Sequence, residues 1–262
     1  MWNIMKALNY QNRKDAYFIY TGLLAVLLSY GIAWIDSGFD FENGGMCFIS
    51  IGSNCGILIL LLSLAWTTRI CGWDCNDKTI NYEILSGHKR RDVYLARVIV
   101  SLIWVLAALF LFLVLPTILV SLVRGWGNQV LLGDALIRYG LIFVITVRII
   151  LISAFLSFLI RNCYGALAVG WLWFSMSMFL SLLANIFTDN TKMTANLFSS
   201  VKLFQLTDFG NYTTKFIDGK DVIIYKIAAK SGEILSTILF TVLILGVLGT
   251  VACILLRKRD MD

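Results

Sequence analysis

Charge and proline are both scarce in this sequence. Only 15% of its 262 residues are charged and one is proline, whereas 59% are hydrophobic. A soluble domain carries about 25% charged residues, and here the deficit falls in long uncharged runs. These runs exclude a soluble enzyme and a disordered chain, and they predict a membrane protein. The single proline excludes proline-rich linkers between domains.

Motifs for metal binding and for phosphate binding are also missing. The six cysteines are scattered, no second Cys or His pair accompanies Cys71 and Cys75, and His88 is the only histidine. We therefore interpret the cysteines as small hydrophobic packing residues rather than zinc ligands or a disulfide framework. The phosphate-binding pattern G-x4-G-K-S/T is absent. We expect no cofactor or metal in this chain, and any ATP and Mg²⁺ on a partner.

Six uncharged or nearly uncharged runs are long enough to cross a bilayer as helices, which takes about 20 apolar residues each. They are Ala16–Ile35, Met46–Trp66, Val98–Val120, Leu141–Ile160, Gly165–Leu183 and Ile234–Leu256. Only the fourth run contains a charge, that of Arg148. Because the gaps leave no room for a nucleotide-binding domain, we predict an all-α membrane protein with six transmembrane helices in a single domain, residues 1–262.

The basic residues predict how these spans are oriented. Thirteen Lys and Arg residues fall in the N-terminal segment, the second-to-third and fourth-to-fifth connections and the C-terminal tail, against two in the short connections on the opposite side. Basic residues in short loops concentrate on the cytoplasmic side, so both termini should be cytoplasmic. Residues 184–233 form a long outer segment that is exempt from this rule. Within it, Met193–Leu206 and Val222–Ala229 are candidates for short helices.

Two segments outside the spans also carry a helical pattern. The apolar side chains of residues 1–10 recur on one face, which favours a short interfacial helix on the inner membrane surface over a frayed terminus. In residues 74–97, Asp77 can cap a helix on which Ile80, Ile84 and Leu85 recur at helical spacing. This cytoplasmic helix has no bilayer to enter, so it needs a protein partner or the membrane surface to bury its apolar face.

With this topology the chain resembles the permease subunits of ABC type-2 exporters, most of all the small bacterial permeases of lantibiotic immunity and bacitracin resistance. The likeness in topology covers the whole length, and in sequence it is sharpest over residues 78–97. There Thr79 opens a short helix, Gly87 follows it, Lys89 adds a basic residue, and Arg97 gives the next span a basic end.

The resemblance implies a transport function. The permease would lie in a bacterial plasma membrane, pair with an identical or paralogous permease chain, and bind two copies of an ABC ATPase; nucleic acid is not an expected partner. It would export an amphipathic peptide, antibiotic or lipid-like substrate, as in self-immunity to a lantibiotic. The coupling helix and its flank, which would contact the ATPase, would present Thr79, Ile80, Tyr82, Glu83, Ile84, Leu85, Gly87, Lys89 and Arg90.

Several residues within the spans are candidates for a substrate path or a subunit interface. Arg148 is costly in mid-span and is therefore a functional candidate, although a buried structural hydrogen-bond donor explains it equally well. One helical face of the fifth span carries Gly170, Phe174, Ser177 and Ser181. For this stripe, and for Gly52 and Gly56 in the second span, close helix packing is favoured over a substrate route. Pro116 lies near the outer end of the third span, where termination of the helix is favoured over a hinge.

Two other functions compete with transport. An intramembrane enzyme is disfavoured, because one histidine and few acidic residues in the spans leave little for acid–base catalysis; we expect no enzymatic activity in this chain. A stand-alone immunity protein would bind a toxin through the outer segment, residues 184–233, without transport. This function is disfavoured because it would leave the apolar residues Ile80 and Ile84 of the predicted cytoplasmic helix without an obvious partner.

Overall fold

The computed structural model describes residues 1–37, 41–76, 87, 89–187, 196–209, 212–217, 220–225 and 231–258. Six helical stretches among them are long and apolar enough to cross a membrane, which confirms the predicted all-α membrane protein. The spans are α2 (Ala16–Asp36), α3 (Gly44–Asn76), the continuous stretch of α5 (Arg90–Leu109), η1 (Phe110–Val114) and α6 (Leu115–Arg124), then α7 (Leu132–Ile160), α8 (Cys163–Phe187) and α11 (Ser231–Lys258). Each contains one predicted run.

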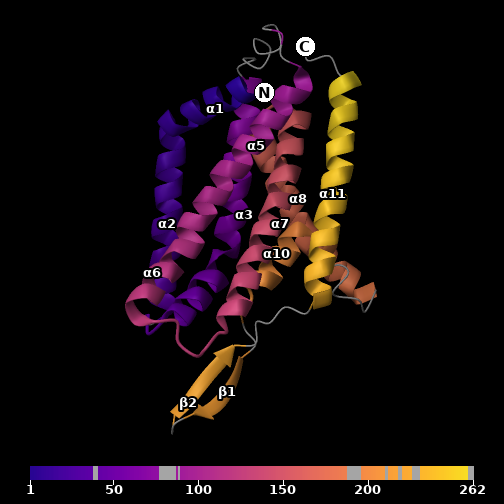
Figure 1. Cartoon of the computed structure of the whole chain (residues 1–262). Helices are drawn as coiled ribbons and strands as arrows, with labels where there is room; N and C mark the ends of the chain where they lie inside the picture. Colours follow the sequence, from indigo (N-terminus) through magenta and orange to yellow (C-terminus); the bar gives the residue numbers. More distant parts are fainter. Residues whose placement is uncertain are drawn as a thin grey trace.

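The two ends of the bundle differ (Figure 1). The start of α1 (Trp2–Lys14) and the end of α11 lie at the same end, which we call the terminal end. The hairpin of β1 (Tyr212–Ile217) and β2 (Lys220–Tyr225) projects from the opposite end, the hairpin end. At the terminal end α1 packs on α5 and α2. The helix predicted at the N-terminus is therefore confirmed.

α3 is the central helix of the bundle. It contacts α2, α5, α6, α7, α8 and α10 (Ser199–Thr207). Its most apolar stretch is 72% buried, against 11% for that of α11. Small residues on α3, such as Gly52, Cys55 and Gly56, let neighbouring segments approach closely. α2 and α11 keep large apolar faces exposed, as expected of helices that contact lipid.

The third span continues past Pro116, so the prediction that it ends there is wrong. Proline has no N–H, and the carbonyl of Phe112 one turn earlier therefore loses its helical donor. The hydroxyl of Ser29 on α2 donates to this carbonyl at 3.1 Å, and the carbonyl of Leu113 accepts from Tyr139 on α7 at 3.1 Å. The turn before the proline widens into the π-helix η1. Because side chains of two other spans satisfy the backbone, the helix runs on as α6.

The outer segment, residues 184–233, is partly helical, as predicted, but it also contains strands. α10 overlaps the predicted helix Met193–Leu206. The prediction of a helix over Val222–Ala229 is wrong for the part that the structure describes, which pairs antiparallel with β1 and places Thr214 opposite Ile223. β-branched and aromatic residues favour a strand, and a short apolar run cannot be assigned to helix or strand by periodicity alone.

Candidate functional site

Arg148 is the one charge within a predicted apolar run, and it lies near the middle of α7. Its side chain is 1% exposed. Nη1 donates to the carbonyl of Asn196 at 2.6 Å, and Nη2 donates to the carbonyl of Leu197. Both carbonyls belong to the outer segment and are 48 and 49 residues away in sequence. The arginine therefore holds a piece of the outer chain inside the bundle.

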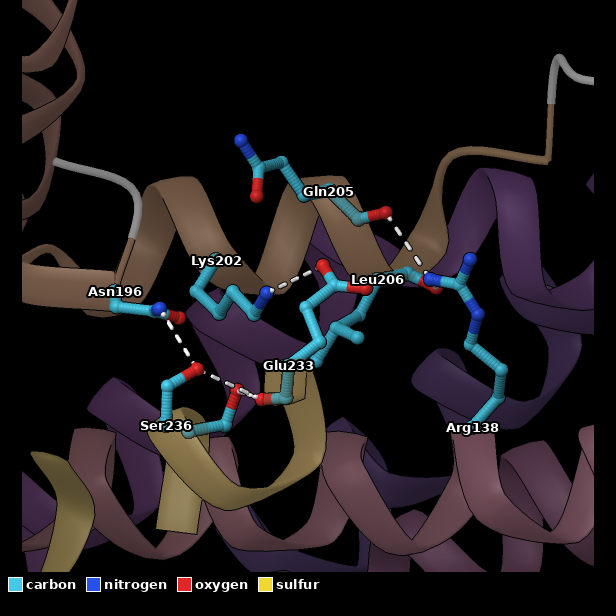
Figure 2. Close-up of polar contacts among 8 residues, drawn as sticks. Arg138, Asn196, Lys202, Gln205, Leu206, Glu233 and Ser236 are labelled. Carbon is cyan, nitrogen blue, oxygen red and sulfur yellow. Dashed lines mark hydrogen bonds and ion pairs between the residues drawn. The ribbon is translucent and has the colours of Figure 1, made fainter. Parts of the chain in front are cut away.

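A second arginine on α7 holds the other end of the same piece (Figure 2). Arg138 Nη1 donates to the carbonyls of Gln205 and Leu206, each at 3.3 Å. These carbonyls belong to the last turn of α10, where they lack partners within the helix, and a cation there also interacts favourably with the helix dipole. The two arginines are separated by a rise of about 15 Å along α7, and α10 rises about 13 Å. α10 is therefore fastened along α7 near both ends.

Residues 196–209, which we call the docked segment, are also tied to α11 (Figure 2). Lys202 Nζ lies 3.0 Å from Oε1 of Glu233 at the start of α11, and Asn196 Nδ2 donates to the hydroxyl of Ser236 at 3.1 Å. Lys202 is buried, and a buried charge is tolerated when it is paired. The docked segment thus depends on α7 and α11 together.

Two glycines of α3 make room for the docked segment. A methyl group added at Gly52 would lie 2.2 Å from Cε2 of Phe209, and one added at Gly56 would lie 2.9 Å from Oγ1 of Thr207. Phe209 is buried, and the centroid of its ring is 5.1 Å from that of Phe48. The two glycines thus allow the docked segment to pack closely against α3.

The docked segment reaches about halfway through the bundle from the hairpin end. α7 starts at that end with Leu132, and Arg148 follows after a rise of about 24 Å. Non-helical backbone at membrane depth is tolerated only where protein buries it and satisfies its polar groups. Arg148 supplies donors to the carbonyls at the deep end. The docked segment therefore occupies the hairpin half of the space beside α3, α7 and α8.

A cavity of about 540 Å³ lies between α7, α8 and α11, next to the deep end of the docked segment. Arg148, Ser177 and Ser199 are its polar lining residues, and its other walls are apolar. Trp173 and Leu243 at the cavity are 53% and 60% exposed, so the cavity opens on the lipid-facing side of α8 and α11. Its volume falls within the range of about 300–1,000 Å³ that is typical of small-molecule sites.

The predicted stripe of the fifth span turns toward the interior of the bundle. Three of its members are at most 3% exposed: Phe174, Ser177 and Ser181. Ser177 lines the cavity, and its hydroxyl lies 2.5 Å from that of Ser200 in the docked segment. Gly170 packs against α3, where an added methyl group would lie 2.5 Å from Cδ1 of Leu64. The structure thus brings Ser177 and Arg148 together at the cavity and places Gly170 in a helix contact.

Most of the predicted coupling residues lie outside the described residues. These are Thr79, Ile80, Tyr82, Glu83, Ile84 and Leu85. Gly87 has a φ of +92°, a backbone conformation that glycine adopts without steric cost. Lys89 precedes the first turn of α5, which begins at Arg90. α3 runs to Asn76 and α5 begins at Arg90, so residues 77–89 connect the two helices in the sequence.

The sequence prediction omits several buried polar residues of the docked segment. They are Asn196, Ser199, Ser200, Lys202 and Thr207. Their spacing does not distinguish them from the exposed polar residues of a loop. The one available signal is a lysine inside an apolar run, Lys202, with an acid at the start of the next span, Glu233.

No protein-family model matches this chain, and no curated protein is significantly similar to it in sequence. The described residues contain no group of three or more His, Cys, Asp or Glu that could hold a metal ion. The site itself combines a buried guanidinium and two serine hydroxyls with an apolar cavity that opens toward lipid. This arrangement suits the binding or passage of an amphipathic molecule.

Proposed function

We propose that this chain is the transmembrane permease subunit of an ATP-driven ABC exporter that moves an amphipathic peptide, antibiotic or lipid-like substrate outward. The observation that carries the proposal is the cavity beside Arg148, which opens toward lipid and is covered toward the hairpin end by the docked segment. A carrier needs a binding space that is reached from one side and a barrier toward the other. Both features meet at Arg148. Release of the docked segment would open the path.

The proposal places the ATPase at the terminal end. α3 has 33 residues and rises about 50 Å, whereas the hydrocarbon core is about 30 Å thick. α3 is thus long enough to join the connection 77–89 to Gly52 and Gly56, which contact the docked segment. Because a helix is a rigid element, a movement of that connection would be transmitted along α3 to these contacts. Binding and hydrolysis of ATP on the partner would shift the equilibrium between a docked and a released state.

The partners follow from this mechanism. Two ABC ATPase subunits carrying ATP and Mg²⁺ would bind the terminal end, and a second permease chain, identical or paralogous, would complete the complex. In a bacterial plasma membrane both termini would be cytoplasmic and the hairpin would lie outside, as the basic residues predict. Self-immunity to a lantibiotic is one setting for such an exporter.

Co-purification in a mild detergent tests the proposal. The tagged chain is isolated from its host membrane, the proteins that accompany it are identified, and ATPase activity is measured. We expect an ATPase with a phosphate-binding G-x4-G-K-S/T motif to accompany the chain and to be lost in Ile80→Asp, which charges the apolar face of the predicted coupling helix. Ser86→Asp is the matched control, because it adds the same charge on the side of the predicted helix opposite that face and should retain the ATPase.

Two results would contradict the proposal. Recovery of the folded chain without any ATPase, across several detergents, would refute the exporter function. Equal loss of the ATPase in Ile80→Asp and Ser86→Asp would show that the apolar face is not the contact. As a further check, Glu83→Lys should abolish transport while the chain still inserts into the membrane.

A second candidate function is a stand-alone immunity protein that binds a toxin at the outer face. The observation that favours it is the hairpin of β1 and β2, which projects away from the bundle (Figure 1). A two-stranded sheet can accept an extended peptide as an additional strand. Protection of cells that lack the ATPase, lost when the hairpin is deleted, would support this candidate over export.

A further inference from the structure

Two polar atoms at the cavity have no hydrogen-bond partner among the described residues. They are Nε of Arg148 and Oγ of Ser199. Both side chains are buried, both line the cavity, and they come from different elements, α7 and the docked segment. Buried polar atoms without a partner are rare in native proteins. Their meeting at one cavity indicates a ligand with a polar group at this position.

The same position also carries a positive charge. A guanidinium is protonated at physiological pH and has five N–H donors, and the hydrogen bonds of Arg148 go to two neutral carbonyls. No carboxylate of the described residues pairs with Arg148; Lys202, the buried lysine of the docked segment, pairs with Glu233. An unpaired charge at this depth is costly, so an anionic group in the cavity would lower the free energy of the site.

The rest of the cavity is apolar. Phe155 and Leu156 line it on α7, about 10–12 Å beyond Arg148 toward the terminal end. Trp173 on α8 and Leu248 on α11 line it from the other two helices. A ligand with its polar group at Arg148 and Ser199 would therefore extend an apolar chain between these three helices.

We propose that the cavity binds a single-chain amphiphile with one anionic head group, a carboxylate or a phosphate. The head group accepts hydrogen bonds from Arg148 and Ser199, and the acyl chain lies along Phe155, Leu156 and Trp173. This assignment rests on the proposed export function and names its substrate class. It disfavours a cationic peptide, because Arg148 would repel it.

Competition for photochemical cross-linking tests the assignment. The chain is reconstituted without any ATPase into phosphatidylcholine nanodiscs and labelled with a diazirine derivative of myristate. Cross-links should map to residues 152–156 of α7 and 243–248 of α11. Myristate and myristoyl lysophosphatidate should compete at about tenfold lower concentration than tetradecanol, as expected for a charge-assisted hydrogen bond, and tetradecyltrimethylammonium should compete least. Competition by only one of the two anions would support the proposal and identify the head group.

Three variants separate ligand binding from folding. Ser199→Ala removes a hydroxyl that has no partner among the described residues, so the protein should stay folded and bind about tenfold more weakly. Arg148→Gln removes the charge and should abolish the preference for an anion over the alcohol. Arg138→Gln is the matched control, because Arg138 also holds the docked segment through backbone carbonyls but does not line the cavity. It should retain the preference.

Three results would overturn the assignment. They are equal competition by the anion, the alcohol and the cation; cross-links that map elsewhere; and loss of the anion preference in Arg138→Gln to the same extent as in Arg148→Gln. The binding experiment uses nanodiscs without any ATPase, so its failure would not affect the result of the co-purification. Failure of the co-purification would refute the exporter function but would leave the measured ligand binding valid.

Discussion

Gly52→Ala should weaken the contact between α3 and the docked segment. The added methyl group would lie 2.2 Å from Cε2 of Phe209, whereas non-bonded carbon atoms pack best at about 3.5–4.0 Å. The ring has little room to shift, because it is buried and its centroid lies 5.1 Å from that of Phe48 and 5.9 Å from the guanidinium carbon of Arg138. Either Phe209 leaves its site or the docked segment moves away from α3.

The magnitude follows from the cost of the added methyl group in the docked state. Inserting a methyl group into a packed contact costs about 1–3 kcal/mol. Because α3 is helical in both the docked and the released state, the higher helix propensity of alanine stabilises both states equally. The docked state should therefore lose about 1–3 kcal/mol relative to the released state, which corresponds to a rise of about 5–150-fold in the released population.

Amide hydrogen exchange in nanodiscs measures this population. Residues 196–207 should exchange about 5–150-fold faster in Gly52→Ala than in the unaltered chain. The control is Gly31→Ala in α2, where an added methyl group meets nothing within 4 Å, and exchange in the docked segment should be unchanged. Unchanged exchange in Gly52→Ala, or equal acceleration in both variants, would refute the docking contact.

Three further perturbations test other contacts. Ser29→Ala should lower the free energy of unfolding by about 1 kcal/mol in thermal denaturation, because the Phe112 carbonyl loses its donor. Lys202→Met should speed exchange in the docked segment because it breaks the ion pair with Glu233, and adding Glu233→Gln should recover part of the loss in a double-mutant cycle. A cysteine that replaces Thr214 in β1, in a chain without its native cysteines, should react with an impermeant maleimide added to intact cells.

Each of these predictions has a contradicting result. Unaltered thermal stability of Ser29→Ala would mean that the carbonyl freed by Pro116 does not need this hydroxyl. Additive effects of Lys202→Met and Glu233→Gln would show that their ion pair does not hold the docked segment. Labelling of the Thr214→Cys variant only after the cells are permeabilised would reverse the orientation predicted from the basic residues.

The six spans were predictable from the sequence because each is a local property. A run of about 20 apolar residues forms a helix in a bilayer whatever its neighbours are, since its backbone groups can bond only within the run. All six predicted runs lie within described helices. The error at Pro116 arose because its consequence is not local. The carbonyls near it are satisfied by Ser29 and Tyr139 from two other spans, and no pattern around the proline indicates those donors.

Only the tertiary structure decided how the outer segment is used. Val222–Tyr225 became a strand because β1 pairs with it, whereas residues 196–209 docked because Arg148 and Arg138 donate to backbone carbonyls 48 to 68 residues away. Every residue has a carbonyl, so such contacts leave no mark in the sequence. The charge of Arg148 was visible from the sequence, but its partners were not. The cavity beside it exists only where α7, α8 and α11 pack around the docked segment.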